Sequence, residues 1–400
     1  MFIVAHTEFE TACFLLFSLL CIILDTNSFR TGQTINNENL LTERVLRVMD
    51  KVREFLRKKD ISLSLGRYGV DAFGAMAQGL FCSLLIGTII NTAGTQLGLP
   101  LLNTIGGFAI KVSGPAMAIA IGHALHCPPL VMFSLAAVGY SANELGGAGG
   151  PLAVYVVTII AAEAGKIVSK ETRIDILVTP FVTIFTGTFL SVLVAPGIGT
   201  AAGWVGKAIM WATEQQPFIM GILVSVIVGM VLTLPISSAA ICAALNLTGL
   251  AGGAALAGCC ANMVGFAVMS FRENRWGGLI SQGLGTSMLQ MGNIVRNPKI
   301  WFPAIITSAI TGPVATCIFR LEMNGPAVAS GMGTCGLVGP IGVYTGWIED
   351  IERGLRESIT SFDWAGLVLV CFVLPAVICW ALGLVFRKIG WIREGDLKLD

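Results

Sequence analysis

The sequence is poor in charge. Of its 400 residues only 12% are Asp, Glu, Lys or Arg, whereas 54% are hydrophobic. Between residues 72 and 165 the only acidic or basic side chains are Lys111, Glu144 and Glu163. An average soluble domain has about 25% charged residues, and so few charges cannot cover a surface that faces water. The composition excludes a soluble fold and predicts an all-α polytopic membrane protein with roughly 8–10 transmembrane helices.

Catalytic and metal-binding patterns are also missing from the sequence. The 11 cysteines form no CxxC pair and have no His partner at ligand spacing, and most lie in apolar runs, as small core residues do. We find no nucleophile triad, no Walker loop and no HExxH motif. We therefore expect no catalytic residue, no metal and no cofactor. The net charge of +1 gives no indication of a nucleic-acid partner.

Basic residues are concentrated on both flanks of the apolar core. Residues 42–67 carry eight basic and four acidic side chains, and residues 387–398 contain four basic ones. Basic segments next to apolar spans tend to stay in the cytoplasm. We therefore expect the N-terminus of the core and the C-terminus to be cytoplasmic. Lys166, Lys170 and Arg173 should lie on the same side.

Apolar stretches bounded by charged residues, Gly or Pro predict the crossings. The Cys127-Pro128-Pro129 break separates two of them, because proline disrupts a helix. The stretch 238–271 is expected to be a helical hairpin. The predicted spans are 72–94, 99–123, 128–140, 151–168, 174–195, 218–235, 238–271, 301–319 and 364–386.

These patterns divide the chain into four parts. We expect residues 1–48 to be an N-terminal extension that the core does not need; the alternative is a genuine additional helix. Residues 49–71 are predicted to form a basic, amphipathic cytoplasmic helix. Residues 72–388 would form the membrane domain, and residues 389–400 a cytoplasmic tail.

Two Gly-rich apolar stretches are too interrupted to form ordinary helices. They are GGLISQGLGTSMLQMGN (277–293) and NGPAVASGMGTCGLVGPIGVYTG (324–346). Irregular backbone at membrane depth occurs only where it is buried in protein or lines a wet cavity. We therefore predict that both are re-entrant or broken segments beside a solute path.

Four stretches resemble a known family of membrane proteins. They are NELGGAGGP (143–151), AAEAGKIVSKETRIDILVTP (161–180), GLGTSMLQMGNIVRNPKIWFP (283–303) and ASGMGTCGLVGPIG (329–342). Together they resemble the EIIC-like permeases of the phosphotransferase system, in particular those of the perfringolysin-regulator type. The resemblance extends over roughly residues 50–400.

The resemblance implies a sugar permease in the bacterial cytoplasmic membrane. It also implies a homodimer in membrane lipid and soluble phosphocarrier partners, EIIA and EIIB, because no phosphoryl-bearing domain is recognised in this sequence. One departure concerns the site. The Gly-Ile-Thr-Glu-type motif of glucose-type permeases is missing, so the acid that would orient a sugar hydroxyl has to be sought elsewhere.

Glu144, together with the neighbouring Asn143, is the first choice for contact with a solute. It follows Asn143 and precedes GGAGG, a turn where backbone can approach closely; the alternative is an exposed acid in a loop. Glu163 has Lys166 three residues later, which predicts an ion pair, with a substrate-facing acid as the other possibility. His123 flanks the break before Pro128 and is either a substrate or proton ligand or a hydrogen-bonded core residue.

Neutral amides supply the other candidates. They are Asn262, Gln282, Gln290 and Asn293. An amide offers both donors and acceptors, which suits an uncharged polyol. The alternative is a structural role as polar contacts between helices.

Three functions are compatible with the sequence. The first is a phosphotransferase permease subunit that moves a small polar solute, such as a sugar. The second is a membrane-embedded regulator of gene expression that acts through partners. The third is a secondary carrier without a phosphorylation step.

Overall fold

The computed structural model describes residues 53–62, 64 and 66–399, which divide into two units between Lys58 and Lys59. The expected extension over residues 1–48 lies outside the described residues. Residues 53–58 are helical, but the predicted helix over residues 49–71 is not continuous. The turn at Lys59 and Asp60 interrupts it, with a φ of 53° at Asp60, and a helix resumes only at Gly66.

The second unit is helical, and its described residues contain no strand. Six continuous helical stretches in this part of the chain are long and apolar enough to cross a membrane. A bent helix pair and the shorter apolar helix Pro217–Thr233 are further candidates. The predicted class, an all-α polytopic membrane protein, is confirmed, whereas the number of crossings stays a prediction.

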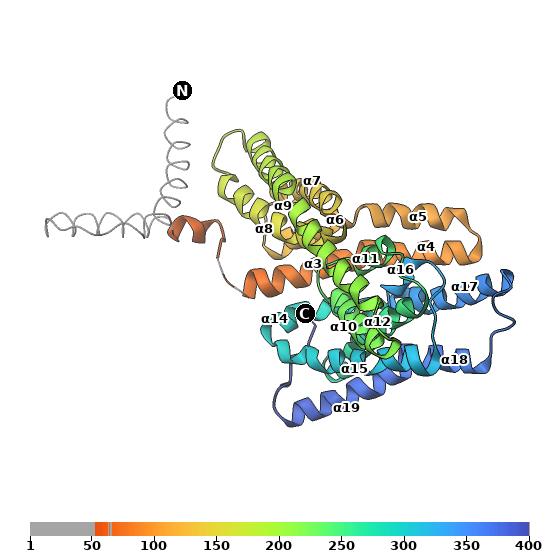
Figure 1. Cartoon of the computed structure of the whole chain (residues 1–400). Helices are drawn as coiled ribbons and strands as arrows, with labels where there is room; N and C mark the ends of the chain where they lie inside the picture. Colours follow the sequence, from red (N-terminus) through yellow and green to blue (C-terminus); the bar gives the residue numbers. More distant parts are fainter. Residues whose placement is uncertain (1–52, 63, 65, 400) are drawn as a thin grey trace, which may run out of the picture. The chain divides into compact units, whose positions relative to one another are not determined.

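The first part of this unit contains seven α-helices, joined in places by π-helical turns (Figure 1). The first apolar stretch, Gly66–Leu97, includes the π-helical turns η1 (Gly66–Ala72) and η2 (Phe81–Leu85). The α-helices are α3 (Phe73–Leu80), α4 (Ile86–Leu97), α5 (Pro100–Lys111), α6 (Ser113–Ala124), α7 (Pro129–Gly146), α8 (Gly150–Val168) and α9 (Asp175–Thr213).

The second part alternates long helices with short broken ones. The long apolar stretches are Gly249–Met269, Pro298–Phe319 and Ser361–Lys388. The α-helices are α10 (Pro217–Thr233), α11 (Ser238–Ala244), α12 (Gly249–Met269), α13 (Phe271–Ile280), α14 (Met291–Arg296), α15 (Phe302–Pro313), α16 (Ala327–Ser330), α17 (Val338–Glu352), α18 (Ser361–Val368) and α19 (Leu374–Lys388).

Helices α7 and α8 form an antiparallel hairpin. Gly147 adopts φ 51° and ψ −122°, a conformation that favours glycine, and turns the chain between them. A Cβ added to Gly165, late in α8, would lie 2.8 Å from a methyl group of Val131, early in α7. The predicted separation of residues 128–140 from 151–168 at the GGAGG turn is thus confirmed.

Three predicted spans differ from the observed helices. The span 99–123 is two helices, α5 and α6, bent by 46°. Helix α9 continues past residue 195 to Thr213, and its 39 residues extend about 58 Å at 1.5 Å per residue. The hairpin expected over residues 238–271 is wrong, because α11 has only seven residues and cannot cross a membrane.

Close helix contact in the second part depends on small residues. Helices α10, α12 and α15 pack against one another (Figure 1). At the α10–α12 contact, a Cβ on Gly258 would overlap the carbonyl oxygen of Ser225. Such close approach is typical of helix packing in membranes, where small residues let backbones come together.

Both segments predicted to be broken are broken. Residues 277–293 pass through the end of α13, the π-helical turn η4 (Ser281–Gly285), the 3-10 turn η5 (Ser287–Gln290) and the start of α14. Residues 324–346 contain the four-residue helix α16, turns with left-handed φ at Gly333 and Gly336, and part of α17. Their irregular backbone is therefore available to shape a site.

Candidate functional site

The tip of the α7–α8 hairpin meets the broken segments through the start of α11. A series of hydrogen bonds links these parts of the chain. The bonds are Ser237 N to Ala148 O (2.9 Å), Ser238 Oγ to Gly331 O (2.7 Å), Thr334 Oγ1 to Gly283 O (2.5 Å) and Thr233 Oγ1 with Ser287 Oγ (2.8 Å). Residues 237 and 238 at the start of α11 therefore link the hairpin tip to residues 324–346, which in turn contact residues 277–293.

Next to the hairpin tip is a cavity of about 490 Å³, within the usual range for small-molecule sites of about 300–1,000 Å³. We call it the hairpin cavity. Leu80 and Leu84 of the first apolar stretch form part of its apolar wall. Its polar lining consists of Lys111, Ser113, Tyr140, Asn143, Glu144 and Ser237.

The charged groups of the hairpin cavity are not paired with each other. Lys111 and Glu144 are both exposed, and neither makes a hydrogen bond or ion pair with any described residue. The side chain of Asn143 is half-buried and likewise makes no hydrogen bond within this part of the chain. These groups can therefore bind a solute without first breaking a protein contact.

Sequence reasoning selected Asn143 and Glu144 but missed Lys111, Ser113, Tyr140 and Ser237. A signal for Lys111 was present, because it is one of three charged side chains in residues 72–165. Charge within an apolar helix is costly and marks functional positions. No comparable signal marks Ser113, Ser237 or Tyr140, because serine and tyrosine are common in apolar helices.

Asn262 lies away from the hairpin cavity and has partners for all its bonds. Its Nδ2 donates to Gly258 O (3.1 Å) and to Ser308 Oγ (3.2 Å). Its Oδ1 accepts from Thr233 Oγ1 (3.2 Å) and from Trp301 Nε1 (3.0 Å). The residue therefore connects α10, α12 and α15, as the structural alternative for this amide predicts.

Gln282, Gln290 and Asn293 form a buried ladder of amides. Gln282 Nε2 donates to Ser270 Oγ (2.8 Å), and Gln290 Nε2 donates to Gln282 Oε1 (2.8 Å). Asn293 Nδ2 donates to Gln290 Oε1 (2.8 Å). The ladder ends on the backbone of Leu397 and Lys398, so the C-terminal segment occupies donors that were predicted to face a solute.

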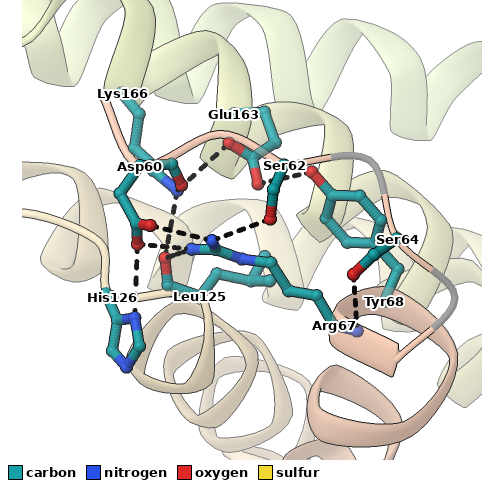
Figure 2. Close-up of polar contacts among 9 residues, drawn as sticks. All are labelled: Asp60, Ser62, Ser64, Arg67, Tyr68, Leu125, His126, Glu163 and Lys166. Atoms are coloured by element: carbon teal, nitrogen blue, oxygen red, sulfur yellow. Dashed lines mark hydrogen bonds and ion pairs between the residues drawn. The ribbon is translucent and has the colours of Figure 1, made fainter. Parts of the chain in front are cut away.

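Glu163 belongs to a charged cluster where α6 and α8 meet the segment before the first apolar stretch (Figure 2). Its Oε2 lies 3.2 Å from Lys166 Nζ, which confirms the predicted ion pair, and its Oε1 accepts from Tyr68 Oη (2.8 Å). Lys166 Nζ also donates to Asp60 O (2.7 Å) and Leu125 O (3.0 Å). Glu163 is thus engaged in a structural network.

Arg67 and Asp60 complete this cluster. The Arg67 guanidinium donates to both carboxylate oxygens of Asp60, at 3.0 and 2.7 Å, and to Leu125 O at 2.7 Å (Figure 2). The hydrogen bonds from Arg67 lower the pKa of Asp60 to about 2. His126 Nδ1 lies 3.2 Å from Asp60. The segments around Asp60, Leu125 and Lys166 therefore meet at one place.

His123 does not line the hairpin cavity, and it is not one of the residues of the charged cluster. It lies in the last turn of α6, is exposed, and makes no hydrogen bond or ion pair with a described residue. A solute or proton role for His123 stays a prediction.

Comparison with known proteins gives one match. The family described as "Phosphotransferase system, EIIC" matches residues 70–399. No curated protein and no solved structure matches the chain. Since the matched region covers most of the sequence, the chain belongs to the EIIC family of the phosphotransferase system, as a multi-pass membrane permease subunit.

Proposed function

We propose that this permease subunit moves a small neutral sugar across the bacterial cytoplasmic membrane and binds it in the hairpin cavity. The observation that supports the proposal is the set of unpaired polar groups in a cavity of small-molecule size. EIIC proteins generally act with soluble EIIA and EIIB proteins, and we propose such phosphocarriers as partners. We further propose that the protein forms a homodimer, because Gly-rich helix faces allow helices to pack closely.

The chemistry of the cavity suits hydroxyl groups. The Glu144 carboxylate accepts hydrogen bonds only, the Lys111 ammonium donates only, and the Asn143 amide does both. Each hydroxyl of a sugar can donate one hydrogen bond and accept others, so a single sugar can satisfy all three side chains. A hydrogen bond to a charged group contributes about 1.5–3 kcal/mol, more than one between neutral groups. Glu144 and Lys111 should therefore each contribute more to affinity than the neutral Asn143.

The proposal is tested by sugar uptake into membrane vesicles that contain the protein. Uptake is measured with and without phosphoenolpyruvate and the soluble phosphocarriers. We expect accumulation of phosphorylated sugar only when all components are present. Uptake that is equal without phosphoenolpyruvate would identify a secondary carrier, and absence of uptake of any tested sugar would favour the regulator.

A further inference from the structure

The segment Asp396–Leu399, which we call the C-terminal segment, lies against the broken segment near α14 (Figure 1). Leu397 is fully buried within the hydrophobic core that also contains Met288 and Met291. The neighbouring Arg393 and Glu394 are exposed. Leu397 is therefore the buried anchor of a segment whose other side chains are at least partly exposed.

Main-chain hydrogen bonds hold the C-terminal segment in place. Leu397 O accepts from Gln290 Nε2 (2.9 Å) and from Asn274 Nδ2 (2.7 Å), and Lys398 O accepts from Asn293 Nδ2 (2.8 Å). The Leu399 N–H donates to Asn274 Oδ1 (2.8 Å). Three side-chain amides therefore form hydrogen bonds with backbone groups of this segment, and they could form the same bonds with another polar ligand.

The segment also closes one side of a second cavity, of about 600 Å³, which we call the tail cavity. Lys398 and Leu399 line it together with Asn274, Ser281 and Phe81. Phe81 begins the π-helical turn η2, whereas Leu80 and Leu84, from the same stretch, line the hairpin cavity. One helical wall thus separates the two cavities.

We infer that the C-terminal segment is a reversible plug, which occupies the amide ladder and restricts access to the tail cavity until it is released. Release would expose the donors of Gln290, Asn293 and Asn274 to the cavity. It would require the loss of these hydrogen bonds, of the bond from Asn297 Nδ2 to Asp396 Oδ2 (2.8 Å) and of one buried leucine, without unfolding a long helix. Local opening of this kind is typical of segments with few anchoring contacts. The inference does not depend on the identity of the transported solute.

The test measures access to a reporter in the tail cavity. Ser281→Cys is introduced into the full chain, and its modification by a water-soluble maleimide in detergent is followed by peptide mass spectrometry. Truncation after Gly395 should increase the modification rate at least tenfold. A synthetic peptide with the sequence of residues 391–400 should restore protection in a saturable manner, and a scrambled peptide should not.

A milder variant covers the case in which the truncated protein does not fold. Asn274→Ala removes two bonds to the C-terminal segment and should increase the modification rate about five- to a hundredfold, the range that corresponds to two net hydrogen bonds. Glu394→Ala is the matched control and should have no effect, because this exposed side chain makes no hydrogen bond or ion pair with a described residue. Folding is checked by circular dichroism. An unchanged rate in folded Asn274→Ala protein, or protection that the peptide fails to restore, would overturn the inference.

Discussion

Lys166 is only 2% exposed, yet its ammonium group has three oxygen partners. Two are backbone carbonyls, of Asp60 and Leu125, and the third is the carboxylate of Glu163. A buried charge is tolerated only when it is paired and hydrogen-bonded. The residue therefore fixes the end of α8 against two other segments.

We predict that Lys166→Ala destabilises the protein strongly, because it leaves the Glu163 carboxylate buried without its cation. Loss of one partner of a buried pair costs about 3–5 kcal/mol. Glu163→Gln should cost less, since the amide oxygen can still accept from Tyr68 and the carbonyls still bind Lys166. Thermal unfolding in detergent measures both, with the exposed Lys207→Ala as control. Equal midpoints for Lys166→Ala and Lys207→Ala would contradict the account.

Asp60 gives the cluster a defined pH dependence. Its pKa is lowered from 3.8 to about 2 by the hydrogen bonds from Arg67, so the folded state favours the carboxylate. The stability that Asp60 contributes is then fully present above the unfolded pKa and is lost as the pH falls toward the folded one. The contribution is modest, because the side chain is more than half exposed.

We predict how the difference in unfolding midpoint between the wild type and Asp60→Asn depends on pH. The difference in unfolding midpoint should be constant from about pH 7 to 5 and should shrink below about pH 4. Thermal unfolding across this range measures it. A difference that grows as the pH falls would show that the carboxylate is not the group responsible.

At the scale of helices, the α10–α12 contact depends on the absence of a side chain at Gly258. A Cβ there would overlap the Ser225 carbonyl, and neither helix backbone can move easily in a packed core. We predict that Gly258→Ala severely lowers the yield of folded protein. Gly203→Ala in α9, where nothing lies within 4 Å of the added Cβ, is the matched control. Size-exclusion chromatography of both variants measures the effect, and equal yields would refute it.

Several elements could be predicted from sequence because their signals are local. The GGAGG turn between α7 and α8 and the breaks in residues 277–293 and 324–346 follow from glycine. The continuation of α9 to Thr213 could not be predicted, because Pro196 and four glycines after it resemble a helix end although the helix continues. The position of α11 depends on long-range contacts with Ala148 and Gly331, which no local pattern encodes.

The same distinction holds for the site. Glu144 and Lys111 could be found from isolated charge in an apolar stretch. The amide ladder was recognised as polar, but its partners are backbone carbonyls about 100 residues later in the chain, at Leu397 and Lys398. Backbone acceptors carry no sequence signature, so only the structure shows that the C-terminal segment occupies these amides.

At the scale of the whole molecule, the basic flanks predict the orientation in the membrane. Ser62 lies in the segment before the first apolar stretch, where it accepts a hydrogen bond from Arg67, and Glu394 follows α19. Both should therefore be cytoplasmic. Ser358 precedes the apolar stretch Ser361–Lys388 and should lie on the opposite side. In intact cells, a membrane-impermeant maleimide should label Ser358→Cys but neither Ser62→Cys nor Glu394→Cys. External labelling of either of the last two would contradict the orientation.

The central claim is that the hairpin cavity binds the sugar through Glu144. Its most direct test is the affinity of detergent-solubilised Glu144→Gln protein for the sugar selected by the uptake measurement, determined by isothermal titration calorimetry. Glu349→Gln, at a partly exposed position outside the cavity, is the control. We predict a ten- to hundredfold loss of affinity, because a charge-assisted hydrogen bond contributes about 1.5–3 kcal/mol. Unchanged affinity in Glu144→Gln, together with its loss in Glu163→Gln, would contradict the claim and place the site near the charged cluster.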